Sequence, residues 1–497
     1  MLGCGHYRVF DEAIEILPEQ RREVLSCQTT VIGPDAEIFL PHASVIAFDG
    51  ARIADEMDIP DHVLNPRFPE GFGVAVDVGT TTVVAALINL ENGRVTHRAS
   101  LYNQQILKAA DVVSRISLCN TPSQLEVLQE LVIHKTLNPL ILKLCADSGI
   151  NKDEMLHLTV SGNTVMTHIF FGVSPVSMGT LPFDPVSRTF VDTASARGID
   201  INPTALIQAI PAISGYIGGD ITSDIFASKL QENGGLSVLI DIGTNGEIVA
   251  NLDGKMTACS TAAGPAFEGA GLLHGTRAAS RAIDSIQYDR NLDFKLTIID
   301  EQTPMGLCGS AIIDFIAEGF RCGLINSMGR YDIELLKKKQ RYESVYNMHA
   351  CILVPAEQSA TGKSITVTEG DIAEILKAKA AIYGGLKSLL TELGRTAHKV
   401  DHLILSGGFA KHINIRNAIT LGLLPDISPE KYQVIGNGSL AGATLALLDK
   451  DVGRAYLELI DKPRVITLNQ TPHFLNYFQE ALAIPNLETD DFPSVTP

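Results

Sequence analysis

Two aspartates, Asp77 and Asp241, each end a short apolar run and stand just before a glycine turn rich in hydroxyl and amide side chains. Glycine lets such a turn point its backbone N–H groups outward, and threonine or asparagine adds donors that suit phosphate oxygens. A carboxylate beside phosphates suits Mg²⁺, which keeps several of its waters when it binds to proteins. The predicted phosphate-contacting residues are Gly79, Thr80, Thr81, Thr82, Gly243, Thr244, Asn245 and Gly246.

The repetition of this turn carries the prediction. A single Asp-x-Gly turn is common in ordinary hairpins, so one copy would say little about function. Here the two copies lie 164 residues apart (241 − 77), and both continue into a further apolar stretch, at 83–90 and 248–252. The pattern predicts strand, phosphate-binding turn and strand in duplicate, with one nucleotide held from two sides.

The elements that must position these turns follow from the apolar periodicity. Short β-branched runs predict buried strands at 73–76, 157–160, 236–240 and 403–405. Apolar residues at helical spacing predict helices at 104–118, 123–146, 165–171, 221–230, 310–321 and 369–393. Thr368 and Asp371 are placed to cap the first turn of the last helix.

Three glycine-rich stretches follow the second turn along the chain. Gly407, Gly408 and Phe409 come directly after a predicted strand, where paired glycines would let an adenine ring or a ribose approach the backbone. The stretch at 260–271 contains Gly264, predicted to contact the nucleotide, and Glu268, which either binds ribose hydroxyls or caps the next turn. The stretch at 436–443 suits tight helix packing where two lobes hinge.

Composition narrows the class of protein. The 497 residues exceed the size of a single core, so two or three domains are expected. The net charge of −18 argues against nucleic acid or an anionic membrane as a partner. No signal segment or apolar span is found, and we expect a cytoplasmic protein. The eight cysteines show no CxxC spacing and the thirteen histidines no HExxH group, so a zinc site is not expected.

The chain divides into four parts by composition. Residues 1–45 are predicted to form a small β-rich unit, and 46–70, with several prolines, an extended linker. The first lobe is predicted at 71–232 and the second at 233–497.

The two turns and the glycine stretches, in this order, resemble the actin, sugar kinase and Hsp70 superfamily of ATPases. Within that superfamily, residues 161–164, 259–271, 306–310 and 405–409 are similar to the reductive activators of corrinoid proteins. The resemblance runs from about Gly71 to the C-terminus. It implies an α/β fold of the duplicated actin-like (ribonuclease H-like) kind, with two lobes.

The resemblance also implies an activity. Members of this family use ATP hydrolysis to move an electron from a [2Fe-2S] ferredoxin-like domain to the cobalt of a corrinoid methyltransferase partner, reducing Co(II) to Co(I). The implied cofactors are ATP and Mg²⁺, the implied partner is a corrinoid protein, and the implied assembly is a homodimer.

The N-terminal region departs from the family pattern. Cys4 and Cys27 resemble ligands in the second half of a plant-type ferredoxin domain, in which four cysteines hold the cluster. Tyr7 stands where a third cysteine is expected, and the chain starts after the expected first ligand. The sequence therefore predicts a degenerate ferredoxin-like remnant without a stoichiometric [2Fe-2S] cluster, and an external ferredoxin-type donor.

Catalysis by such an ATPase is mostly positioning and charge neutralisation. Mg²⁺ is predicted near Asp77 and Asp241, and Glu247 and Asp220 are both candidates for orienting the attacking water. Salt-bridged or helix-start acids remain the alternative for the latter pair.

Two other functions stay open at this point. One is an activator of 2-hydroxyacyl-CoA dehydratases, with Cys259 and Cys308 imagined as ligands of a [4Fe-4S] cluster shared in a dimer, although both also fit as packed core thiols. The other is a non-redox ATP-binding regulator or chaperone of a corrinoid or methyltransferase protein.

Overall fold

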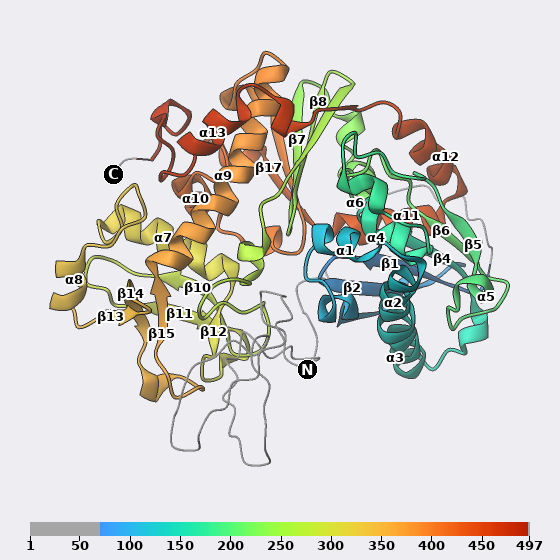
Figure 1. Cartoon of the computed structure of the whole chain (residues 1–497), viewed down its shortest axis with the longest axis horizontal. Helices are drawn as coiled ribbons and strands as arrows, with labels where there is room; N and C mark the ends of the chain where they lie inside the picture. Colours follow the sequence, from blue (N-terminus) through green and yellow to red (C-terminus); the bar gives the residue numbers. More distant parts are fainter. Residues whose placement is uncertain (1–69, 496–497) are drawn as a thin grey trace.

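A computed structural model describes residues 70–495. The predicted ferredoxin-like remnant at 1–45 and nearly all of the predicted linker at 46–70 lie outside these residues. Figure 1 shows two bodies side by side, one built from the blue and green first half of the chain and one mainly from the yellow and orange second half.

The first body is built around a mixed six-stranded sheet in the order β3-β2-β1-β4-β6-β5. Its strands are β1 (Phe72–Val78), β2 (Thr82–Asn89), β3 (Val95–Tyr102), β4 (Met155–Ser161), β5 (Val191–Thr193) and β6 (Leu206–Ala209). The first three strands run antiparallel, and β4 and β6 continue the sheet in parallel with β1. The central strands are buried on both faces, which matches their unbroken apolar sequence.

The second body repeats this arrangement. Its sheet has the order β17-β16-β7-β8-β9-β18. The strands are β7 (Leu236–Ile242), β8 (Gly246–Leu252), β9 (Lys255–Thr261), β16 (His402–Ser406), β17 (Tyr432–Gly436) and β18 (Arg464–Val465). Strands β7, β8 and β9 are antiparallel, and β16 and β17 lie parallel to β7. Each acidic turn therefore lies between the first two strands of one sheet, as the duplicated motif predicts.

Two small sheets extend the second body. One has the order β11-β10-β12 and the other β13-β14-β15. Their strands are β10 (Ala282–Gln287), β11 (Lys295–Ile298), β12 (Gly306–Leu307), β13 (Tyr342–Val345), β14 (Met348–Val354) and β15 (Ile365–Thr368). Their apolar faces join the large core formed by the helices of the same body.

Helices cover the faces of both large sheets (Figure 1). Those before β7 are α1 (Val112–Leu118), α2 (Pro122–Val132), α3 (Asn138–Ser148), α4 (Thr164–Phe170), α5 (Ala194–Arg197) and α6 (Gly219–Ala227). Those after it are α7 (Gly309–Cys322), α8 (Ile333–Lys338), α9 (Glu369–Glu392), α10 (Ile415–Leu421), α11 (Gly438–Leu448), α12 (Lys450–Leu459) and α13 (Phe474–Glu480). Within residues 70–495, none of the helices combines the length and apolar character needed to span a bilayer.

The prediction for the longest helix is confirmed, and the one for 104–118 is wrong in part. Helix α9 starts with a capping box. The hydroxyl of Thr368 accepts a hydrogen bond from the backbone N–H of Asp371, and the carboxylate of Asp371 accepts one from the backbone N–H of Thr368. The predicted helix at 104–118 is instead a short 3-10 turn (Gln104–Leu107) followed by α1. The break arises because Asp111 caps Ser114 and starts a new helix there.

The predicted helix at 123–146 is helical throughout but not uniform. A π-helical segment (Ile133–Leu137) separates α2 from α3. Pro139 follows it closely, and because proline has no N–H and its ring crowds the carbonyl four residues earlier, the ordinary helical bond cannot form at that point.

Helix α11 comes from the end of the chain but packs in the first body, against β1, β4 and α6. The packing there is close: a Cβ on Gly73 would lie 2.6 Å from the Leu447 side chain. Thr159 of β4 also donates a 2.8 Å hydrogen bond to the carbonyl of Ala443. Figure 1 shows α11 beside the strands of the first sheet. An apolar core containing α6 and α11 joins the facing sides of the two large sheets.

Candidate functional site

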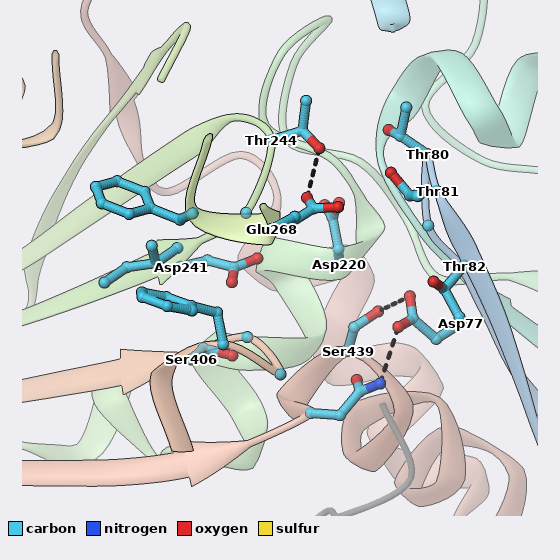
Figure 2. Close-up of a pocket in the computed structure, with 18 of the residues that line it drawn as sticks. Asp77, Thr80, Thr81, Thr82, Asp220, Asp241, Thr244, Glu268, Ser406 and Ser439 are labelled. Carbon is cyan, nitrogen blue, oxygen red and sulfur yellow. Dashed lines mark hydrogen bonds between the residues drawn. The ribbon is translucent and has the colours of Figure 1, made fainter. Parts of the chain in front are cut away.

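One cleft, lined from both bodies, brings together most of the predicted site residues. Its lining includes Asp77, Gly79, Thr80, Thr81, Thr82, Asp220, Asp241, Gly243, Thr244, Asn245, Glu247, Glu268, Gly407, Gly408 and Phe409. Figure 2 shows the first turn (Thr80 to Thr82) facing the second (Thr244) across this cleft, with carboxylates between them. The sheets bring the acids together because Asp77 and Asp241 lie at equivalent ends of β1 and β7.

The first turn is held open by hydrogen bonds to its backbone. Asn103 donates from its side-chain amide to the carbonyl of Gly79 at 2.9 Å, and its backbone N–H donates to the carbonyl of Thr81 at 2.9 Å. The buried guanidinium of Arg115 donates to the carbonyl of Thr80. These bonds fix the backbone of the turn at the cleft, and the side-chain amide of Asn163 donates to the Thr80 hydroxyl at 3.2 Å.

Hydrogen bonds within the second turn and to a neighbouring loop hold this turn in place. The N–H of Gly243 donates to the carbonyl of Asn245 at 3.0 Å. The hydroxyl of Thr244 donates to the Glu268 carboxylate at 2.6 Å, the upper dashed contact in Figure 2. Its carbonyl accepts the N–H of Gly264 at 2.9 Å.

Two predicted contact residues lie behind the cleft surface. Gly246 is buried in β8, where a Cβ would lie 3.0 Å from the Ile382 side chain. Gly264 supports the second turn through its N–H and has a left-handed φ of +80°, which suits glycine. Neither belongs to the residues that line the cleft.

The cleft holds a group of buried acids that repel one another. Burial, followed by the charges of Asp220 and Asp77, raises the pKa of Asp241 to about 8. Burial also raises the pKa of Asp220 to about 7, against a lowering hydrogen bond from the Ile221 backbone. Burial raises the pKa of Glu247 well above its ordinary value, and the charges of Asp220 and Asp241 add to this shift. Such a group favours a bound cation, because a cation would offset the cost of several desolvated carboxylates.

Asp224 is a cleft acid that the sequence reasoning missed. It follows Asp220 by one helical turn on α6, so both face the cleft, and it is completely buried. Burial, followed by the charge of Asp241, raises its pKa well above the ordinary range. The spacing of four residues on a predicted helix was the available signal.

Asn437 and Ser439 fix the orientation of Asp77. The amide of Asn437 donates to one carboxylate oxygen at 2.9 Å and the hydroxyl of Ser439 to the other at 2.8 Å (Figure 2). Burial raises the pKa of Asp77, and these two hydrogen bonds act in the opposite direction. Residues at the start of α11, which suggested only helix packing in the sequence, therefore also hold the first acid in place.

For the ATPase activity predicted from the sequence, we expect Ser439→Ala to lower the rate of hydrolysis about 10-fold, because a hydrogen bond to a charged group contributes about 1.5–3 kcal/mol. The comparison is kcat/KM for ATP in wild type and variant, with Ser117→Ala, a change at an exposed helical serine, as the control. Equal rates in Ser439→Ala and the control would contradict a role for this contact.

Asp241 packs closely against the first glycine of the pair that follows β16. Gly407 has a φ of +96°, and a Cβ there would lie 2.7 Å from Oδ1 of Asp241. The ring of Phe409 stacks on Phe267 with centroids 5.3 Å apart. Both rings line the cleft and give it an apolar wall beside the second turn.

The cysteines considered as cluster ligands are packed thiols. Cys259 is fully buried in β9 and Cys308 nearly so before α7. Burial raises the pKa of both thiols, which disfavours the thiolate form that ligates iron. Cys4 and Cys27 lie outside the described residues. Among residues 70–495, no three histidine, cysteine, aspartate or glutamate side chains converge on a point where they could ligate a metal together.

Comparison with known proteins places the chain in a family. Residues 72–233 match a model described as the RACo middle region, and residues 235–496 match the C-terminal domain of RACo, the ASKHA domain.

Two curated relatives are similar over three quarters of the chain. A corrinoid activation enzyme, RamQ, of Eubacterium limosum is 33% identical over 391 residues, covering 76% of this chain and 65% of the relative. A [Co(II) methylated amine-specific corrinoid protein] reductase of Methanosarcina barkeri is 23% identical over 419 residues, covering 76% of this chain and 70% of the relative. The chain thus spans somewhat less than two thirds of the length of RamQ.

A solved structure supports the same assignment. The reductive activator for a corrinoid, iron-sulfur protein is 36% identical and superimposes with a TM-score of 0.80, covering 86% of this chain and 68% of the other. The predicted α/β actin-like fold and the resemblance to reductive activators of corrinoid proteins are both confirmed. The chain belongs to the RACo family, whose C-terminal domain is an ASKHA domain.

Proposed function

We propose that this protein is an ATP-dependent reductive activator of a corrinoid protein, which couples ATP hydrolysis to the reduction of Co(II) to Co(I) in a methyltransferase system. The observation that carries the proposal is the acidic cleft between two phosphate-binding turns in a chain of the RACo family. The relatives named for corrinoid activation support it. The acting form is proposed to be a cytoplasmic homodimer.

The residues that line the cleft fit Mg²⁺ and a nucleoside triphosphate. The cleft offers carboxylate and hydroxyl oxygens, the ligands that Mg²⁺ prefers, and Mg²⁺ usually binds proteins through one or two carboxylates together with water and substrate phosphates. Asp77 and Asp241 are the proposed contacts to the hydrated ion. When bound, Mg²⁺ neutralises charge on the phosphates and on the surrounding carboxylates.

The residues of the protein itself position the nucleotide and the attacking water. The turns at 79–82 and 243–245 bind the phosphates, Phe409 and the glycines before it border the nucleoside, and Glu268 is the proposed ribose contact. Glu247 and Asp220 are the two candidates for orienting the water that attacks the terminal phosphorus. Burial raises the pKa of both, and the value of about 7 for Asp220 suits a group that accepts a proton near neutral pH.

The electron source is proposed to be an external ferredoxin-type donor. This rests on Tyr7, which stands where a ferredoxin-like domain would have a ligand. Iron and acid-labile sulfide measured after anaerobic reconstitution should fall well below two per chain. A stoichiometric two-iron cluster would refute the degenerate cluster domain on which this proposal rests.

The decisive experiment mixes the protein with Mg²⁺, ATP, a low-potential reductant and candidate Co(II) corrinoid proteins, and follows the cobalt absorption. We expect Co(I) to appear only when ATP and the protein are both present, with ADP and Asp241→Asn as controls. ATP turnover that never produces Co(I) with any corrinoid protein would point instead to a non-redox regulator and overturn the proposal.

A further inference from the structure

Arg277 carries the one strong positive charge among the described residues that line the cleft. No other lysine or arginine of residues 70–495 belongs to its lining, whereas six of its lining residues are aspartate or glutamate. A bound nucleoside triphosphate would add further negative charge to the cleft. A cation fixed in this place therefore has a larger electrostatic effect than one on the open surface.

One side of Arg277 is tied to the first turn. Its guanidinium carbon lies 4.7 Å from the ring centroid of Tyr102, a cation–π contact. Tyr102 pairs directly with Thr82 in the ladder between β2 and β3, and the next residue, Asn103, holds the carbonyls of Gly79 and Thr81. The ring thus belongs to the frame of the first phosphate turn.

The other side of Arg277 is tied to the second turn. Its Nη2 lies 3.7 Å from Oε2 of Glu268, and the other oxygen of that carboxylate accepts the hydroxyl of Thr244. The ion pair is loose and about a quarter exposed on each side, so it holds the guanidinium in place without saturating its donors. Arg277 therefore lines the cleft between groups that contact both turns.

We infer that Arg277 is a catalytic residue that contacts the terminal phosphate of ATP during hydrolysis. The inference rests on the proposed ATPase function. In the reaction, water attacks the terminal phosphorus, the bond to the bridging oxygen of ADP breaks, and phosphate and a proton are released. The planar guanidinium offers paired N–H donors to the equatorial oxygens, where negative charge is spread in the transition state.

The test compares Arg277→Ala, Arg277→Lys and wild type in the full chain with Mg²⁺. Single-turnover ATP hydrolysis is expected to fall about 10³-fold in Arg277→Ala, the lower end of what a transition-state arginine contributes. Arg277→Lys should recover part of the rate, since it keeps the charge but loses the fork. Affinity for ADP, which lacks the terminal phosphate, should change less than threefold in both variants. Arg98→Ala removes an exposed arginine from the strand that carries Tyr102 and serves as the matched control.

Several outcomes separate this inference from its alternatives. If the wild type hydrolyses ATP and Arg277→Ala is equally active, the inference is overturned and the proposed function stands. A wild type that neither binds nor hydrolyses ATP would overturn both. Tyr102→Leu removes the ring but not the guanidinium and should slow hydrolysis less than 10-fold. Equal losses in Tyr102→Leu and Arg277→Ala, or equal losses of ATP and ADP affinity in Arg277→Ala, would show that Arg277 only bridges the two bodies.

Discussion

Replacing Asp241 by asparagine is expected to lower Mg²⁺-dependent ATP hydrolysis by about 10²–10³-fold while making the nucleotide-free protein more stable. The two effects have one cause. The carboxylate lies at the end of β7 among other acids, where it is suited to a bound cation but costs free energy when none is present. Asparagine keeps the size of the side chain and removes the charge.

The gain in stability should grow with pH. Burial raises the pKa of Asp241 to about 8, whereas an unfolded aspartate titrates near its ordinary value of about 4. Between these values the folded state binds a proton that the unfolded state releases, so this group lowers the free energy of unfolding as the pH rises. Asparagine removes that dependence.

The measurement is thermal unfolding with a metal chelator at pH 5.5 and pH 8, alongside ATPase rates. We expect a midpoint about 2–4 °C above wild type at pH 8 and a smaller difference at pH 5.5. Asp293→Asn, at an exposed aspartate of the same body, should change neither property. A lower midpoint for Asp241→Asn at pH 8 would contradict the account.

Gly442→Ala is expected to destabilise the protein by about 1–3 kcal/mol, the range for overpacking a tight core. Helix propensity alone predicts the opposite, because alanine is better than glycine in a helix by about 1 kcal/mol. The reason for the reversal is the crossing of α11 and α6: a Cβ at Gly442 would lie 2.4 Å from Cβ and 2.5 Å from Cα of Ser223. Backbone atoms cannot rotate away, so the helices would have to separate.

Denaturant unfolding of Gly442→Ala and Gly234→Ala provides the measurement and its control. At Gly234 an added Cβ meets nothing within 4 Å, so this variant should keep wild-type stability. Because Ser439 lies one turn before Gly442, we also expect weaker ATP hydrolysis in Gly442→Ala. A stabilised Gly442→Ala would mean that propensity outweighs the close contact.

Local patterns predicted the turns and strands because their causes are local. The acids, the glycines and the β-branched runs around residues 77 and 241 lie within a few positions of one another, and the structure forms both hairpins as expected. Thr368 and Asp371 likewise act on each other across one helical turn.

The parts that could not be predicted depend on contacts between distant residues. Arg277 acquires its position from Tyr102, 175 positions earlier (277 − 102), and no local pattern marks it. Ser439 and Asn437 reach Asp77 only because α11 returns to the first body. Asp224 differs from these, since its spacing from Asp220 was visible and only the burial of that helix face was not.

The return of α11 to the first body also affects when that body can complete its folding during synthesis. A chain leaves the ribosome from its N-terminus, and domains that are contiguous in sequence fold as they emerge. Here the first body lacks its covering helix until residue 448 has been synthesised, although its strands β1 and β4 end at residues 78 and 161. The apolar residues of β1 and β2 in the core that contains α11, such as Ala75 and Val84, lack this helix for most of translation. We therefore expect a chain that ends before α11 to leave this side of the first sheet incompletely packed, a state that favours aggregation.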